Sequence, residues 1–317
     1  MNIEEIKELN LWPNNKKTTT NKGLDELENS GYNLFYIGKN ADLYTTSGKE
    51  AKILLVRSDR TSVFDIPLNL EIEGKGIIQT SISNFGAKFA NNFGIKTAIL
   101  DEKVDSSLKV YPRCQLMELC KPLEATINGE LVQFELIFRN YLTGSLFQAL
   151  QDNLDPYGLN LPKDLKEWHK FDNAIFTPTT KGLKDEPLES ADVREVFPEI
   201  IEKLENLFKS FTKFAEERGI IVVDTKFEVF VEEDGTWVLG DEILTPESSR
   251  FIPKEEFLKA NFVSMDKQIL RDFGKKENWK EQAKSLKASE KLEVKVPQEI
   301  KDKILNGYKT ILERLSK

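Results

Sequence analysis

The chain has 317 residues, of which 39% are hydrophobic and 31% charged, and its net charge is −8. This balance is typical of a globular protein with a substantial core, and it argues against a surface built for the phosphate backbone of nucleic acid. With two cysteines, Cys114 and Cys120, and one histidine, His169, the chain offers no zinc-ligand set. A lone histidine also does not by itself indicate a catalytic triad.

The first residues lack the basic start and apolar run of a signal peptide, and no apolar stretch is long enough to cross a bilayer. Two cysteines in a chain of this length are typical of a reducing compartment. We therefore expect a cytoplasmic protein with neither nucleic-acid nor membrane partners, as a monomer or a homo-oligomer. The charge balance is compatible with a local basic pocket for a small anionic substrate.

The first half of the chain is rich in strand patterns. Residues 1–30 are polar, and 14–21 read as a flexible or surface segment. Alternating apolar residues predict strands at 34–37, 41–45 and 53–57, which form an antiparallel meander with its first bend at Gly38. A helix is predicted at 80–93. Strands are predicted again between 117 and 139, where Asn128-Gly129 indicates a hairpin.

The second half mixes helices with strands. Apolar residues at three- and four-residue spacing predict an amphipathic helix at 191–218, which Gly219 ends. A hairpin at 220–241 follows, then a Lys- and Glu-rich solvated stretch at 274–296 and a last helix from Pro297. This order predicts an α+β fold with an N-terminal antiparallel nucleotide-binding lobe at 1–118 and a larger α+β lobe with C-terminal helices at 119–317.

The hairpin at 220–241 carries charged residues on one face. Asp224, Lys226 and Glu228 share that face because side chains alternate along a strand. Asp234-Gly235 suits a two-residue type I′ turn, which would place Glu228 directly opposite Asp241. Facing carboxylates repel unless a cation lies between them, and Mg²⁺ with a nucleotide's phosphates would fit. A three-residue loop would instead put the two acids on opposite faces, and a solvated charged face is the alternative to a metal site.

Several further segments are denser in glycine, hydroxyl and charged residues than strand ends require. Taken singly, each is more often turn chemistry than a site, and Gly38-Lys39 is not part of a Walker loop. Together they occur in a recognisable order: GKNADLY (38–44), SDRTSVFD (58–65), GKG (74–76), RNYLTGS (139–145), FTPTTK (176–181), VDTKFE (223–228), GDEILTPESSRF (240–251) and DKQILRD (266–272).

With these segments the chain resembles the phosphoribosylaminoimidazole-succinocarboxamide synthase (SAICAR synthase) family over roughly residues 36 to 273. The resemblance implies an ATP-grasp-related two-lobed fold, with antiparallel sheets, flanking helices and ATP held between the lobes. It also implies an ATP-dependent ligase of de novo purine biosynthesis. In that reaction L-aspartate joins carboxyaminoimidazole ribotide (CAIR) through an acyl phosphate, with Mg²⁺ as cofactor, to give SAICAR, ADP and phosphate.

The resemblance also implies roles for individual residues. Gly38 and Lys39 would approach the ATP phosphates, and Glu228 and Asp241 would bind both ATP and Mg²⁺. Asp224 and Lys226 would be the catalytic pair at the imidazole carboxylate, with Asp224 as the candidate base for the aspartate amine. Three residues, Arg139, Ser145 and Arg250, would hold the phosphate of the ribotide, because a guanidinium group grips phosphate in a bidentate way. The remaining substrate-binding residues would be Asp65, Lys75, Lys181, Asp185 and Ser249.

Two departures from the family pattern bear on the activity. The usual Gly-Lys-x-Arg/Lys-Asp has Ala41 at its fourth position here, so one phosphate-facing cation is missing. Where many members have His-Asp-Glu, this chain has Lys184-Asp185-Glu186. Two alternatives to an active SAICAR synthase therefore stay open. One is a weakened homologue that binds ATP and a ribotide as a sensor or scaffold, and the other is a kinase of related fold.

Overall fold

The computed structural model describes the chain except for residues 1–23, 47–51, 103, 183–184 and 288–289. The surface segment expected at 14–21 and the residue Lys184 lie outside the described residues. Contacts divide the chain into two compact units. Unit 1 contains residues 1–85, 98–120 and 264–316, and unit 2 contains 86–97, 121–263 and Lys317. The boundary expected after residue 118 falls close to the passage from Cys120 to Lys121. Residues 264–316, which we expected with the second lobe, group by contacts with the first.

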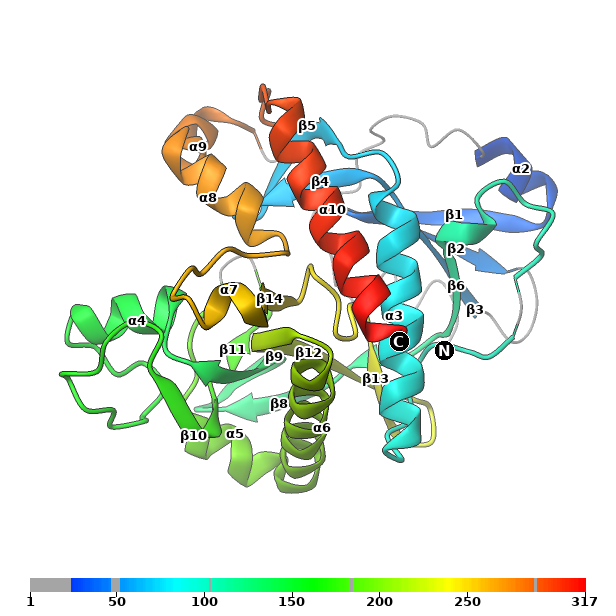
Figure 1. Cartoon of the computed structure of the whole chain (residues 1–317). Helices are drawn as coiled ribbons and strands as arrows, with labels where there is room; N and C mark the ends of the chain where they lie inside the picture. The colour runs from blue at the N-terminus through cyan, green and yellow to red at the C-terminus, as the bar shows by residue number, and fades with distance from the viewer. Residues whose placement is uncertain (1–23, 47–51, 103, 183–184, 288–289) are drawn as a thin grey trace. The chain divides into compact units, whose positions relative to one another are not determined.

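The main sheet of unit 1 is a four-stranded antiparallel meander in the order β1-β2-β3-β6 (Figure 1). Its strands are β1 (Tyr32–Ile37), β2 (Ala41–Thr46), β3 (Lys52–Arg57) and β6 (Cys114–Glu118), with helix α2 (Leu24–Asn29) and the 3₁₀ turn η1 (Tyr111–Arg113) beside them. A core cluster that includes Leu27, Tyr44, Leu54 and Val56 covers this sheet. The meander and its bend at Gly38 therefore follow the predicted pattern.

A second hairpin in unit 1 joins β4 (Arg60–Val63) to β5 (Ile66–Glu71). Its two loop residues, Phe64 and Asp65, have φ values of 56° and 60°. Left-handed backbone at both positions is the mark of a type I′ turn, which normally takes asparagine or glycine. The segment SDRTSVFD thus forms a tight and strained turn that presents Asp65 at its tip.

Helix α3 (Lys75–Asn92) begins five residues before the predicted start at Thr80. Oδ1 of Asp59 accepts a hydrogen bond of 2.9 Å from the backbone N–H of Gly76. A carboxylate that accepts such a bond satisfies one of the free N–H groups of the first helical turn. Asp59 precedes the helix by a whole hairpin, so local periodicity gave no sign of this earlier start.

The C-terminal part of unit 1 is helical. It contains α8 (Gln268–Lys276), α9 (Trp279–Gln282), the 3₁₀ turn η2 (Ala283–Ser285) and α10 (Gln298–Leu315). The predicted last helix corresponds to α10, which buries Ile304, Tyr308, Ile311 and Leu315. Part of the stretch expected to be solvated is instead buried, because Trp279 packs against Phe273 with ring centroids 5.7 Å apart.

Unit 2 is built on an eight-stranded sheet in which the long strands β9 (Glu130–Tyr141) and β12 (Ile220–Val231) pair directly. The shorter strands are β7 (Lys121–Pro122), β8 (Glu124–Ile127), β10 (Lys170–Phe176), β11 (Thr179–Thr180), β13 (Trp237–Gly240) and β14 (Ser249–Pro253). Helices α4 (Gly144–Gln151), α5 (Ser190–Val196), α6 (Pro198–Glu217) and α7 (Lys254–Phe257) complete the unit. Every pairing between these strands is antiparallel.

The single helix predicted at 191–218 is two helices, because Pro198 starts α6 and Phe197 between them leaves the helical region with φ −127° and ψ 54°. Proline lacks the N–H that a continuous helix would need at this point. The apolar stripe of α6, which includes Leu204, Phe208 and Phe211, is fully buried, as its spacing predicts.

The hairpin between β12 and β13 has a different register from the one that the two-residue turn predicts. Glu228 pairs with Gly240 rather than with Asp241. Residues 233–235 form a three-residue loop, in which the N–H of Glu232 donates to the carbonyl of Thr236 at 2.9 Å and Gly235 has φ +87°. The prediction of a two-residue type I′ turn was therefore wrong, and the alternative three-residue loop is the one observed.

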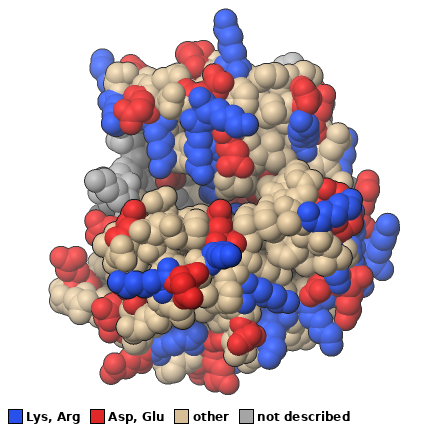
Figure 2. Space-filling view, turned by 60° about the vertical axis from the view of Figure 1, so that its left-hand side comes forward, with Lys and Arg blue, Asp and Glu red and all other residues tan. Residues whose placement is uncertain are grey.

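No helix among the described residues is long and apolar enough to span a membrane. On the face seen in Figure 2, Lys and Arg side chains alternate with Asp and Glu side chains rather than forming a surface of one sign.

Candidate functional site

A cluster of acidic and ammonium groups lies on one face of the unit 2 sheet. Lys226 and Glu228 project from β12, and the ammonium group of Lys226 lies 2.8 Å from Oε1 of Glu228. Glu135 of β9 accepts a second hydrogen bond from Lys226, and Lys181, just after β11, donates to Oε2 of Glu228. The cluster is thus assembled from three strands of one sheet, and both carboxylate oxygens of Glu228 are held by lysines.

Asp241 joins this cluster despite the changed register. It follows the last residue of β13 and has φ 55°, so it lies outside the alternation that would have placed it on the far face of the sheet. Burial, followed by repulsion from Glu228 and Glu242, raises the pKa of Asp241 to about 7. The predicted neighbourhood of Glu228 and Asp241 is therefore present, although strand pairing does not produce it.

Glu228 shows the opposite behaviour. Burial alone would raise the pKa of its carboxyl group, but Lys181 and Lys226 outweigh burial and hold the pKa far below its ordinary value. For Lys226, burial would lower the pKa, whereas Glu228, Glu135 and Asp241 raise it well above the ordinary range. At neutral pH the cluster therefore holds charged Glu228 and charged Lys226 beside a carboxyl group, Asp241, that is partly protonated.

This donor set suits a hard cation that shares its ligands with phosphate. Glu228 and Asp241 supply carboxylate oxygens, and repulsion between them would be relieved by a divalent ion. Within the described residues no group of three or more His, Cys, Asp or Glu side chains could hold a metal ion. A magnesium ion here would therefore need further oxygen ligands from a bound substrate and from water, as magnesium ions in proteins usually have.

A second cluster, two β12 residues away from Lys226, consists of Asp224 between two arginines. On the two flanking strands, Arg139 of β9 and Arg250 of β14 both pair with Asp224. Nη1 of Arg139 lies 2.8 Å from Oδ2 of Asp224, and Nε of Arg250 lies 3.0 Å from both carboxylate oxygens. One carboxylate thus orients two guanidinium groups, and the trio keeps a surplus positive charge.

The start of helix α4 lies against this trio. A Cβ added at Gly144 would lie 2.9 Å from Nη1 of Arg250, so a larger residue would displace this guanidinium group, and the φ of +63° also favours glycine. Ser145 follows and is exposed. The first N–H groups of a helix, a serine hydroxyl and two guanidinium groups all favour an anion.

Two buried residues to which the sequence analysis gave no role support Arg139: Thr177, within the segment FTPTTK, and Tyr157, which lies in none of the quoted segments. Oγ1 of Thr177 accepts a hydrogen bond of 2.9 Å from Nε of Arg139, and the phenol of Tyr157 also accepts one from Arg139. Glu135 is a third functional residue that sequence reasoning missed. It lies on the same β9 face as Arg139, and an acid inside an otherwise apolar strand would have been the signal for it.

Ser249 does not join the arginine cluster. It neighbours Arg250 along β14, so its side chain points to the other face of the sheet. There its hydroxyl lies 2.7 Å from Oγ1 of Thr225 and is buried.

In unit 1 the bend that contains Gly38 and Lys39 is firmly held. Nη2 of Arg60 donates to the carbonyl of Gly38 at 2.9 Å, and Arg60 also forms a buried ion pair with Asp42. A Cβ added at Gly38 would lie 2.7 Å from the carbonyl oxygen of Ala41. The bend therefore requires glycine, and Arg60 fixes the backbone on either side of Lys39.

The Lys39 side chain itself is accessible. Its ammonium group lies 3.0 Å from Oδ1 of Asp65, and the two side chains are 47% and 76% exposed. Lys75, in contrast, is only 1% exposed at the start of α3. Asp185 is exposed in the loop after β11. Of the predicted residues in unit 1, Lys39 and Asp65 thus lie together at the surface, and Lys75 is buried.

Residues 34–286 match the SAICAR synthetase family. The chain belongs to this family. Phosphoribosylaminoimidazole-succinocarboxamide synthase of Neisseria meningitidis serogroup B is 34% identical over 295 residues, which cover 89% of this chain and 96% of that protein. The synthase of Pasteurella multocida is 35% identical over 296 residues, covering 89% and 97%.

Among solved structures, the SAICAR synthase from Saccharomyces cerevisiae complexed with SAICAR superposes with a TM-score of 0.71 at 29% identity. The match covers 94% of this chain and 98% of that one. The predicted SAICAR synthase family and the predicted α+β class with antiparallel sheets and flanking helices are thereby confirmed.

Proposed function

We propose that this chain performs the reaction for which its family is named. The enzyme is an ATP-dependent carbon–nitrogen ligase of purine biosynthesis. It joins L-aspartate to CAIR through an acyl phosphate and releases SAICAR, ADP and phosphate. The alternative of a sensor or scaffold without activity is not favoured, because the relatives that match nearly the full chain are synthases.

The observation that carries the proposal is the arrangement of the β12 face. Asp224, Lys226 and Glu228 follow one another at every second residue, and each has a charged partner on a neighbouring strand or directly after one. One end of this row is an anion clamp and the other is a carboxylate–ammonium cluster. A substrate with a phosphate at one end and a carboxylate to be activated at the other matches this row.

At the clamp end, Arg139, Arg250 and Ser145 bind the 5′-phosphate of the ribotide, supported by the start of α4. Asp224 holds both guanidinium groups in place for this purpose. The carboxylate of Asp224 accepts hydrogen bonds from both arginines, and these bonds stabilise its charged form and make it a poorer proton acceptor. This geometry favours a positioning role for Asp224 over its predicted role as base for the aspartate amine.

At the other end, Lys226 lies where the imidazole carboxylate of CAIR would be activated. Its raised pKa keeps it cationic, so it stabilises negative charge on the carboxylate and on the transferred phosphoryl group. Glu228 and Asp241 would hold Mg²⁺, which supplies charge neutralisation of the phosphates during transfer. Lys181 balances the charge of Glu228.

In unit 1, Lys39 would approach the ATP phosphates from a bend whose backbone Arg60 fixes. Its pairing with exposed Asp65 is weak enough to be exchanged for a phosphate. We keep Asp65, Lys75, Asp185 and Ser249 as substrate-binding predictions, with Lys75 and Ser249 acting from buried positions. The cytoplasmic location, the oligomeric state and the absence of nucleic-acid and membrane partners likewise stay predictions.

The purified protein tests the proposal in a coupled assay for ADP release, with the product identified by mass spectrometry. ADP release that requires both CAIR and L-aspartate and yields SAICAR supports the ligase. Release that needs CAIR but not aspartate would indicate a kinase, and no release under any condition would indicate a scaffold. Either of these outcomes would overturn the proposal.

Asp241→Asn tests the magnesium assignment in the same assay. We expect turnover to fall by about a hundredfold or more, because an amide is a poorer ligand for Mg²⁺ than a carboxylate. Asp234→Asn is the matched control, since Asp234 lies in the exposed loop of the same hairpin. Near-normal turnover of Asp241→Asn would contradict the assignment.

A further inference from the structure

The bend from Gly38 to Asp42 carries one basic residue, Lys39. A triphosphate is a dense anion, and its binding depends on the number of cations placed around it. The proposed ATP site of unit 1 therefore calls for positive charge from elsewhere in the chain.

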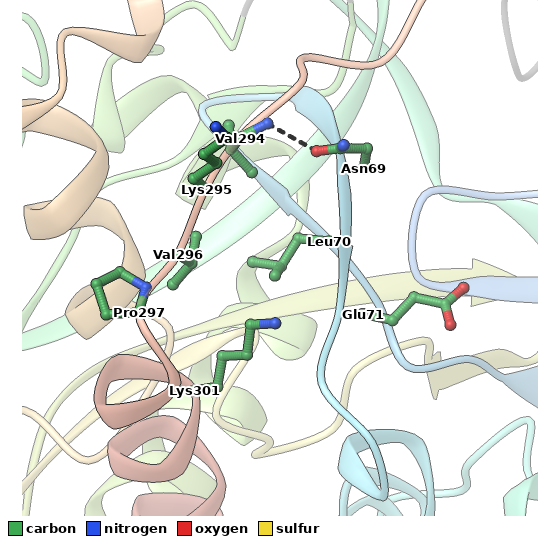
Figure 3. Close-up of a pocket in the computed structure, with 8 residues that line it drawn as sticks. All are labelled: Asn69, Leu70, Glu71, Val294, Lys295, Val296, Pro297 and Lys301. Carbon is green, nitrogen blue, oxygen red and sulfur yellow. Dashed lines mark hydrogen bonds between the residues drawn. The ribbon is translucent and has the colours of Figure 1, made fainter.

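A segment close to the C-terminus runs alongside β5 and is fixed there. The N–H of Leu292 donates to the carbonyl of Pro67 at 2.9 Å, and the N–H of Asn69 donates to the carbonyl of Leu292 at 3.1 Å. The side chain of Asn69 accepts a further bond of 2.7 Å from the N–H of Val294 (Figure 3). Leu292 is buried. These bonds give the segment a definite position although it is not part of a strand.

The direction of this pairing places Lys291 near the bend. Leu68 and Leu292 form a parallel bridge, so Lys291 lies at the level of Pro67, close to the start of β5. The turn just before β5 carries Asp65, whose carboxylate contacts Lys39. Lys291 thus approaches the bend from the side of β5.

The charge of Lys291 reaches the bend. Burial raises the pKa of Asp42, and Arg60 followed by Lys291 acts against that rise. Asp42 is already neutralised by its buried ion pair with Arg60. Within the part of the chain that the structure describes, no hydrogen bond or ion pair joins the half-buried Lys291 to another residue. An ammonium group in that situation gains when an anion binds beside it.

We propose that Lys291 contacts the phosphates of ATP and adds its positive charge to that of Lys39. The assignment rests on the proposed function, because it adds a residue to the ATP site of the ligase. The segment 290–296 then has a binding role. It carries a cation to the Gly38–Asp42 bend from a remote part of the chain, and its bonds to β5 set the position of that cation.

Binding of a non-hydrolysable ATP analogue with Mg²⁺, measured by calorimetry without CAIR or aspartate, tests the assignment. We expect Lys291→Ala to weaken binding about tenfold, the effect of losing one phosphate-facing charge. Lys291→Arg should keep most of the affinity. Lys295→Ala is the matched control, because Lys295 lies exposed on the same segment, and its affinity should equal that of the wild type. In the coupled assay, Lys291→Ala should raise the KM for ATP and leave the KM for CAIR unchanged.

A second variant moves the positive charge from position 291 to position 41 and so separates a loss of charge from a loss of structure. The double variant Ala41→Lys, Lys291→Ala should recover affinity for the analogue, because the bend itself then carries the second cation. Wild-type affinity of Lys291→Ala, or failure of the double variant to recover affinity, would overturn the assignment. If the wild type binds the analogue but forms no SAICAR, the ligase function fails while the binding data still decide the role of Lys291.

Discussion

Single positions in this enzyme are constrained by close approach as much as by charge. Gly144 shows this most clearly, because its missing side chain leaves room for the guanidinium group of Arg250. Tyr44 shows the converse, since its hydroxyl group is buried in the unit 1 core and has no hydrogen-bond partner among the residues that the structure describes. Burial raises the pKa of Tyr44 far above its ordinary value. Each position leads to a prediction that one substitution can check.

We expect Gly144→Ala to raise the KM for CAIR about tenfold while the protein stays folded, because the new methyl group displaces Arg250 from the phosphate clamp. Steady-state kinetics with CAIR as the varied substrate measure this. Gly129→Ala is the control, because Gly129 has an equally left-handed backbone, φ +87°, but open space where its Cβ would lie. Equal effects of both variants on KM would mean that backbone strain, not the guanidinium contact, is responsible.

Tyr44→Phe should leave the free energy of unfolding unchanged or raise it by up to about 1 kcal/mol, because the variant removes a buried hydroxyl group for which the described part of the chain offers no partner. Urea unfolding followed by circular dichroism measures the change. Tyr157→Phe is the comparison, since the hydroxyl of Tyr157 is hydrogen-bonded to Arg139 and its loss should destabilise the protein. A clear destabilisation by Tyr44→Phe would show that its hydroxyl group is satisfied in solution.

At the scale of elements, periodic patterns predicted the strands and helices well, and their ends and registers poorly. The alternation along β12 was enough to place Lys226 and Glu228 on one face, because that pattern depends only on the strand being continuous. The register of the hairpin between β12 and β13 could not be predicted from the sequence, because Asp234-Gly235 suits both a two-residue and a three-residue loop. Likewise the break between α5 and α6 depends on Pro198, and the spacing of apolar residues gives no information about such a break.

The parts of the site that escaped prediction depend on contacts between distant segments. Glu135 acquires its role only when β9 lies beside β12, and Asp241 only when its left-handed backbone returns it to Glu228. The turn at Phe64 and Asp65 carries no glycine or asparagine, so no local signal marks it as type I′. Motifs predicted candidate residues, while the pairing of strands decides which of these residues meet.

Helix α3 gives a prediction of its own. A Cβ added at Gly86 would lie 2.3 Å from the backbone carbonyl oxygen of Ile243, which cannot move without shifting the chain after β13. Gly86→Ala should therefore destabilise the protein by roughly 2 kcal/mol or more, although alanine favours helices. Lys88→Ala, at an exposed position of the same helix, should change stability by less than about 0.5 kcal/mol in the same urea titration. A stabilised Gly86→Ala would contradict this packing.

For the molecule as a whole, the cluster of Glu228, Asp241 and their lysines shapes how stability responds to pH. Asp241 has a pKa of about 7 in the folded chain, above the ordinary value of an unfolded aspartate. The folded state therefore binds more protons than the unfolded state between these values. The contribution of Asp241 to the stability of the fold is therefore fully present below the ordinary aspartate pKa, and it is lost as the pH rises through 7. Glu228, whose pKa is lowered, acts in the opposite sense, and its contribution is lost in acid.

In metal-free buffer with EDTA we expect the wild type to lose stability between pH 5 and pH 8, whereas Asp241→Asn should lose less and be more stable at pH 8, by roughly 2 kcal/mol. Thermal unfolding at a series of pH values measures both. Asp234→Asn should follow the wild type. A wild type and Asp241→Asn that respond identically to pH would show that Asp241 is ionised like an ordinary carboxyl group.

The row of charges on β12 also bears on how the sequence can change in evolution. Asp224, Lys226 and Glu228 meet partners from β9 and β14 at alternate positions, so one inserted or deleted residue between them would turn part of the row to the other face. Residues 233–235 beyond the strand bear no such constraint, because they form an exposed loop. Natural variation in chain length should therefore accumulate in this loop and be absent from residues 224–228.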